Sequence, residues 1–101
     1  MIIRWIRLQN ILDDIFLSRG LRSKIYASNS LPSNLIAGVG KNGLDVAILL
    51  NLNENKSEHQ IIESLAHEIA HILNNNNTHD SIHQEKCLEI KLQITKLMGK
   101  E

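Results

Sequence analysis

Apolar side chains recur every three or four positions near the start of the chain, as they do on one face of an α-helix. The stripe begins at Ile2, continues through Leu8 and Leu12, and ends at Phe16. Gly20 follows shortly afterwards and is a suitable stop for a helix. We therefore expect a helix over residues 2–18, with this stripe as its buried face.

Between residues 24 and 52 the helical spacing gives way to short apolar runs. Residues 24–27 predict a short strand, and residues 35–39 and 44–52 predict two more. Asn42-Gly43 lies between the last two runs, and this pair tolerates the positive φ of a hairpin turn. Residues 46–50 are continuously apolar, which is typical of a strand covered on both faces. The pattern predicts a small sheet of two or three strands that contains a hairpin.

Helical spacing returns in the second half of the chain. Ser57, a favourable N-cap residue, precedes an apolar stripe that ends at Leu73. Residues 74–77 are asparagines, which interrupt helices, and a second stripe runs from about Asp80 to Met98. The predicted fold is α+β: an N-terminal helix, a small sheet and two C-terminal helices. At 101 residues, the whole chain (1–101) is expected to form a single domain.

Composition and charge narrow the classes of function. Eleven basic and eleven acidic residues balance, so no basic surplus indicates nucleic-acid binding. A local basic cluster without interleaved aromatic residues is interpreted as a solvated face; it consists of Arg4, Arg7, Arg19, Arg22 and Lys24. No apolar run approaches the roughly 18–20 residues of a membrane span, and the one cysteine, Cys87, allows no internal disulfide. These features predict a cytoplasmic protein without nucleic-acid or membrane partners.

The candidate chemistry is the motif His67-Glu68-Ile69-Ala70-His71 in the second predicted helix. Residues four apart project from the same face of a helix, so both imidazoles can bind one Zn²⁺ at about 2.0–2.1 Å. Glu68 lies beside His67 and would reach a metal-bound water as its general base. The rest of residues 65–73 is apolar, where an unsatisfied polar group costs roughly 1–3 kcal/mol. The motif therefore predicts one zinc ion.

A catalytic zinc usually has three protein ligands, so a third must come from elsewhere in the chain. The candidates are Glu85, Glu89, His79 and His83. Glu85 stands at the edge of an apolar row of the last helix and is the preferred metal ligand, whereas Glu89 is turned about 40° further toward solvent.

His83 belongs to a different row of the last helix, with Cys87, Ile90 and Ile94. Its position allows three roles: a metal ligand, a satisfied core histidine, or a catalytic residue that stabilises the oxyanion of a tetrahedral intermediate. His79, in the preceding loop, is a weaker candidate for the oxyanion role. We place His83 with Glu68 among the candidate catalytic residues.

Residues 65–73, followed by a short loop and by Glu85 in the last helix, resemble the arrangement of gluzincin metallopeptidases. The likeness is greatest to the minigluzincins and the ImmA/IrrE-type metallopeptidase domains. The resemblance implies a zincin-like fold, with His67, His71 and Glu85 as zinc ligands and Glu68 as the general base. It also implies that residues 44–52, taken as the edge strand, bind an extended peptide antiparallel.

Taken together, the motif and the resemblance predict a zinc-dependent endopeptidase, in which a metal-bound water activated by Glu68 hydrolyses a peptide or protein substrate. The alternative is a zinc-binding or latent regulatory module with little or no proteolytic activity, for example one that interacts with a repressor. Self-association through the amphipathic first helix is left open.

Overall fold

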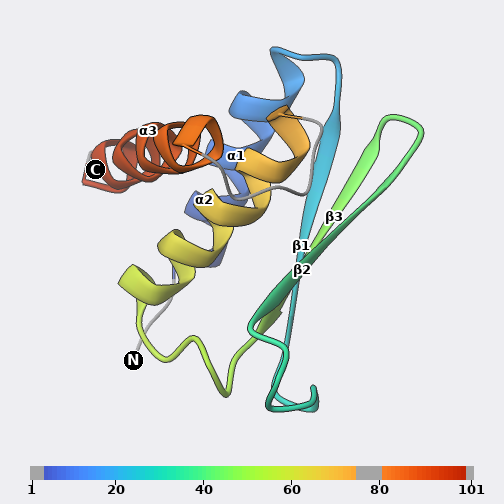
Figure 1. Cartoon of the computed structure of the whole chain (residues 1–101), viewed down its shortest axis with the longest axis vertical. Coiled ribbons are helices and arrows are strands. Elements are labelled where there is room, and N and C mark those ends of the chain that lie inside the picture. Colours follow the sequence, from blue (N-terminus) through green and yellow to red (C-terminus); the bar gives the residue numbers. More distant parts are fainter. Residues whose placement is uncertain (1–3, 75–80, 100–101) are drawn as a thin grey trace.

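A computed structural model of the chain describes residues 4–74 and 81–99. The elements are α1 (Trp5–Leu17), β1 (Arg22–Ser28), β2 (Ala37–Asn42), β3 (Asp45–Asn51), α2 (Glu58–Asn74) and α3 (Ser81–Met98). The three helices lie on one side of a three-stranded mixed sheet (Figure 1). The predicted α+β class and the predicted order of helices and strands are confirmed.

The sheet has the strand order β1-β3-β2. β1 pairs with β3 in parallel, and β2 pairs with β3 antiparallel. β2 and β3 are joined by a two-residue loop between the paired residues Asn42 and Asp45. Its first residue, Gly43, has φ 62°, a backbone conformation that glycine adopts at no steric cost. The predicted hairpin is confirmed, and the third strand is added on the far side of β3.

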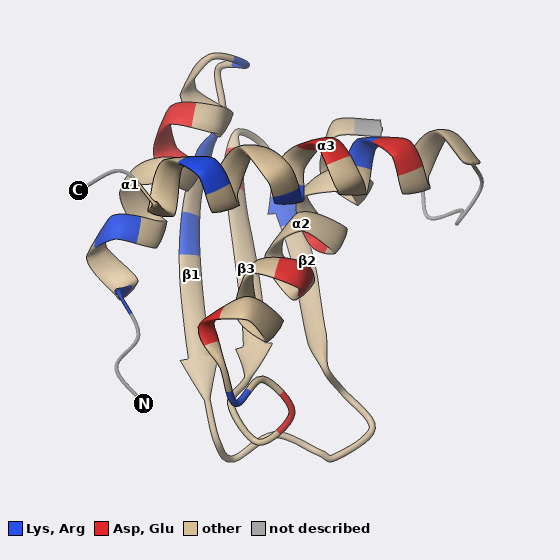
Figure 2. Ribbon diagram, turned by 90° about the vertical axis from the view of Figure 1, so that its left-hand side faces the viewer, with Lys and Arg blue, Asp and Glu red and all other residues tan. Residues whose placement is uncertain are grey.

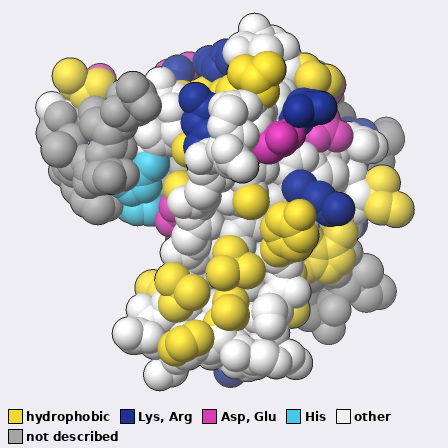
Figure 3. Space-filling model, turned by 90° about the vertical axis from the view of Figure 1, so that its right-hand side faces the viewer, with side chains coloured by type: hydrophobic (Ala, Val, Ile, Leu, Met, Phe, Trp, Pro, Cys, Tyr) yellow, Lys and Arg dark blue, Asp and Glu magenta, His cyan; other side chains and the backbone are white. Residues whose placement is uncertain are grey.

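β3 is the central strand, but the prediction that both of its faces are covered is wrong. Val46, Ile48 and Leu50 are buried against the helices, whereas Ala47 on the opposite face is exposed. The open face carries scattered hydrophobic and charged side chains (Figure 3). The continuous apolar run of residues 46–50 therefore reflects the central position of β3 between two strands. It does not reflect a second layer that covers the other face of the sheet.

One aliphatic core lies between the helices and the sheet. Each helix contributes fully buried side chains, among them Phe16 of α1, Leu65 of α2 and Ile94 of α3. Ser57 caps α2 as predicted, because its Oγ accepts a hydrogen bond from the Gln60 N–H at 3.1 Å. Within the described ranges no helix is both long enough and apolar enough to span a membrane.

Two arginines at the start of α1 donate hydrogen bonds to carbonyls at the end of α3. The Arg4 guanidinium donates to the Met98 carbonyl at 2.8 Å, and Arg7 donates to the Leu97 carbonyl at 2.9 Å. These carbonyls belong to the last turn of α3, which has no later turn to donate to it. Arg4 also binds both carboxylate oxygens of Glu58, and this hydrogen bonding lowers the pKa of the Glu58 carboxyl. Basic and acidic residues are otherwise dispersed over the described elements (Figure 2).

The outer edge of β1 is closed by a side chain. Gln9 of α1 donates from Nε2 to the Ser23 carbonyl at 3.0 Å, and its Oε1 accepts from the Ile25 N–H at 3.0 Å. A carboxamide carries the same donor and acceptor as a peptide group. Gln9 therefore pairs with the edge of β1 at the positions that a further strand would use.

Two buried asparagines hold the segment before β2 in place. Asn51 donates to the carbonyls of Pro32 and Leu35, and Asn55 donates to the Ile36 carbonyl at 3.0 Å. The Asn55 Oδ1 in turn accepts from the Ser64 hydroxyl of α2 at 2.6 Å. This network ties residues 32–36 to α2 at the turn preceding His67.

Replacing Asn55 by alanine is expected to lower the free energy of unfolding by about 2 kcal/mol. Asn55 is 1% exposed, and its loss removes its hydrogen bonds with the Ile36 carbonyl and the Ser64 hydroxyl. Urea unfolding of the two proteins measures the difference. Asn53→Ala is the matched control, because Asn53 bonds the Asn29 carbonyl at an exposed position and its loss should cost less than about 0.5 kcal/mol. Equal stability of Asn55→Ala and wild type would contradict the role given to the network.

Candidate metal centre

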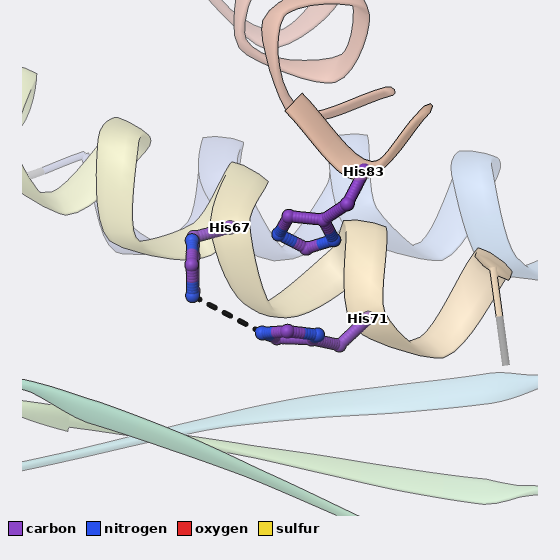
Figure 4. A group of neighbouring side chains, drawn as sticks. All are labelled: His67, His71 and His83. Carbon is purple, nitrogen blue, oxygen red and sulfur yellow. Dashed lines mark hydrogen bonds between the residues drawn. The ribbon is translucent and has the colours of Figure 1, made fainter. Parts of the chain in front are cut away.

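α2 presents His67 and His71 on one face, one turn apart, as the spacing predicts. Their Nε2 atoms are 3.1 Å apart (Figure 4). Two nitrogens that each lie about 2.05 Å from one tetrahedral ion are separated by about 3.3 Å. The pair is thus spaced as two ligands of a single ion are.

α3 supplies a third imidazole, from His83. Its ring centroid lies 4.2 Å from that of His71 and 5.0 Å from that of His67. Ring nitrogens of the three residues all lie within 4.8 Å of one another. Figure 4 shows the three rings gathered beside α2, with His83 reaching them from α3. We refer to His67, His71 and His83 as the histidine cluster.

Glu85, the preferred third ligand from sequence, is not brought to the cluster. It is exposed, and the group of described residues placed to hold an ion contains His83 instead. The reason is helical phase: α3 buries His83, Ile90 and Ile94 on one face. Glu85 is two residues beyond His83, about 200° around the helix, and so points away from α2. The structure thus brings His83, and not Glu85, to His67 and His71.

The position of His83 also bears on its proposed catalytic role. It is 2% exposed, and a nitrogen of its ring lies within 4.8 Å of those of the other two imidazoles. Of the roles that the sequence allowed, the structure favours the metal ligand over the oxyanion-stabilising residue.

Other described residues with side chains that can bind a metal are not part of the histidine cluster. Glu89 is exposed and 3.7 Å from the Lys86 ammonium, and His59 lies 3.2 Å from Glu63. His79 lies outside the described residues. Cys87 is half-buried in α3, and burial raises the pKa of its thiol, so it remains uncharged at neutral pH. Glu89, His59 and Cys87, the three described residues among these, are not members of the group placed to hold an ion.

Glu68 occupies a position suited to a base and not to a ligand. It is 9% exposed and follows His67 on α2, but it is not a member of the group that could hold an ion. Both residues line a cavity of about 400 Å³ between α2 and the segment 34–37 that leads into β2. We call this the strand-side cavity. Its walls thus bring together Glu68 and one member of the histidine cluster, His67.

The donor set of the cluster suits zinc. Neutral imidazole nitrogens are common zinc ligands, and three protein ligands leave a fourth tetrahedral position for water or substrate. His67 and His71 are partly exposed, and histidine side chains reach the surface in Figure 3. A fourth ligand from solvent or substrate therefore has access to the cluster.

The strand beside the cluster is β2, and the expectation that residues 44–52 form the edge strand is wrong. β3 has β1 on one side and β2 on the other. The Asn51 N–H donates to the Ile36 carbonyl, so peptide groups at even positions of β2 face β3. Those of Ala37, Val39 and Lys41 face the open edge. Apolar patterning indicated both strands of the hairpin but carried no signal for their order in the sheet.

Comparisons of the chain with protein-family models, with curated proteins and with solved structures found no match. The resemblance to gluzincins accordingly stays a prediction that depends on the motif and on the local geometry.

Proposed function

We propose that the protein is a zinc-dependent endopeptidase with a zincin-like arrangement of site and edge strand. The observation that carries the proposal is the histidine cluster, with two imidazoles spaced as zinc ligands, a third at the same point, and Glu68 beside it on the same helix. Chance pairing of two histidines on α2 would not bring a buried histidine from α3 to the same place.

In this proposal His67, His71 and His83 hold one zinc ion through ring nitrogens. The bound ion would supply a Lewis acid that polarises the substrate carbonyl and lowers the pKa of water toward about 7. His83 is 2% exposed, so the α3 side of the site is shielded from water. A dry setting strengthens the electrostatic interactions within the site.

Glu68 is the proton-transfer group of the proposed reaction. Its carboxylate accepts the proton of the attacking water and then delivers it to the leaving amine nitrogen. Because Glu68 lines the strand-side cavity with His67, it can reach a water between them. Glu68 is 9% exposed, so its side chain is largely shielded from solvent.

The substrate main chain is assigned to the free edge of β2. An extended peptide can add to a sheet edge through main-chain hydrogen bonds, here with the peptide groups of Ala37 and Val39. Ala37 also lines the strand-side cavity, next to His67 and Glu68. A peptide paired with β2 would therefore pass in front of the histidine cluster.

The test is zinc-dependent peptide hydrolysis by the full chain. Protein loaded with one equivalent of zinc is expected to cleave unstructured peptides, to lose this activity on removal of the metal by a chelator, and to regain it when zinc is added back. Products are followed by mass spectrometry. Stoichiometric zinc without cleavage would favour the alternative, a zinc-binding or latent regulatory module, and absence of zinc binding would contradict both.

A further inference from the structure

A second cavity opens on the other side of His67, between α2 and α3. It has a volume of about 420 Å³, and we call it the interhelical cavity. His67 and His83 of the histidine cluster line one part of it, and Glu63 and Lys91 line another. His83 and Lys91 are eight residues apart on α3, a rise of about 12 Å. The cavity thus leads away from the cluster along the groove between the helices.

Between these ends the cavity is lined by uncharged side chains. Cys87 and Leu88 form its α3 wall. The Cys87 thiol remains protonated because its burial raises its pKa. At the far end the Lys91 ammonium lies 2.7 Å from the Glu63 carboxylate, and this hydrogen bond lowers the pKa of Glu63. The two charges neutralise each other, so the cavity offers no single charge for a substrate ion to pair with.

Leu88 is 56% exposed although it belongs to a helix with a well-packed apolar face. Exposed leucines are common and need no explanation on their own. Leu92, one turn later, is 60% exposed and lines neither this cavity nor the strand-side cavity. What distinguishes Leu88 is therefore its place in a cavity that begins at two of the proposed zinc ligands.

We infer that the interhelical cavity is a specificity pocket, which takes an aliphatic side chain of the substrate residue next to the cleaved bond. The inference rests on the proposed endopeptidase function and names its substrate class. His67 and Glu63 line both the strand-side cavity and the interhelical cavity, so a side chain of a peptide paired with β2 can pass His67 into the interhelical cavity. Leu88 and Cys87 then contact the aliphatic group, and the Glu63–Lys91 pair limits its length.

The size of the expected preference follows from burial of methylene groups. One methylene in a hydrophobic pocket changes kcat/KM by about tenfold or more. Leucine or methionine beside the cleaved bond should therefore be preferred over alanine by at least about tenfold. Aspartate and glutamate should be disfavoured to a similar extent, because the paired Lys91 leaves them without a counter-charge.

The experiment is cleavage-site profiling of a mixed peptide library by the zinc-loaded full chain. Products are sequenced by mass spectrometry, and kcat/KM is then measured for matched peptides with leucine or alanine at the preferred position. Leu88→Ser is the test variant and Leu92→Ser is its matched control on the same helix. We expect Leu88→Ser to reduce the leucine-over-alanine preference at least threefold, and Leu92→Ser to leave it unchanged.

A second variant tests the far end of the cavity. Lys91→Ala removes the partner of Glu63 on that side, and lysine or arginine should then gain at the same substrate position relative to wild type. Cleavage without a side-chain preference on either side of the bond would contradict the specificity pocket. So would a leucine preference that Leu88→Ser leaves unaltered. Neither result would contradict the proposed endopeptidase function. Failure of the wild type to cleave any peptide overturns the proposed function, and the pocket with it.

Discussion

Glu68→Gln is expected to lower peptide hydrolysis by about 10²- to 10⁴-fold and to leave the zinc content at one ion per chain. Glutamine keeps the shape of glutamate but cannot accept the proton of the attacking water, which is the step assigned to Glu68. The ligands His67, His71 and His83 are unchanged, so zinc binding should persist. The measurement is kcat/KM on one peptide, together with metal analysis of the same preparation.

Glu89→Gln is the control for this substitution, since Glu89 is exposed on α3 and lies outside the group of residues that could hold an ion. It should retain both activity and zinc. Loss of zinc in Glu68→Gln would show instead that the carboxylate takes part in metal binding. Full activity in Glu68→Gln would remove it from the reaction.

His83→Ala is expected to weaken zinc binding at least about a hundredfold, whereas Glu85→Ala leaves it unchanged. Loss of a residue that only orients a ligand already costs about 10- to 100-fold in metal affinity, and removal of a ligand itself costs more. His83 stands within 4.8 Å of the other imidazole nitrogens, and Glu85 is exposed on the far side of α3. Competition with a chromophoric zinc chelator measures both affinities.

Because His83 is buried, the comparison needs a control for folding. His83→Cys keeps a zinc-binding group at the same position and should recover part of the lost affinity, while circular dichroism reports whether the helices persist. If Glu85→Ala loses zinc and His83→Ala keeps it, the third ligand is Glu85 and not His83.

The parts of the fold that depend on local pattern were predictable. The apolar stripe of α1, the Ser57 cap of α2 and the hairpin turn at Gly43 each reflect interactions within a few residues of one another. The same holds for His67 and His71, whose common direction follows from one turn of helix. These features needed no knowledge of how the helices cross.

The third ligand and the strand order depend on contacts between distant segments. His83 was recognised as sharing an apolar row with Ile90 and Ile94, and that row does face the core. The resemblance implies Glu85, and in the sequence Glu85 shares a row with Leu88 and Leu92, but both of these leucines are exposed. Only the crossing of α3 over α2 decides which row meets the histidines.

Strand order escaped prediction for a related reason. The apolar run of residues 46–50 fits a central strand as well as a doubly covered one, because both bury more surface than an edge strand does. β1 carries Arg22 and Lys24, so its composition gives no sign that it pairs in parallel with β3.

Because the Gln9 carboxamide occupies the outer edge of β1, a further strand adds more easily at the edge of β2. An extended chain that approached β1 would have to displace a side chain already bonded to Ser23 and Ile25. At β2 the peptide groups of Ala37, Val39 and Lys41 face outward, on the edge next to α2. Gln9 thus disfavours binding of a substrate at the β1 edge, which is remote from the histidine cluster. It also disfavours aggregation through pairing of this edge with the sheet of another molecule.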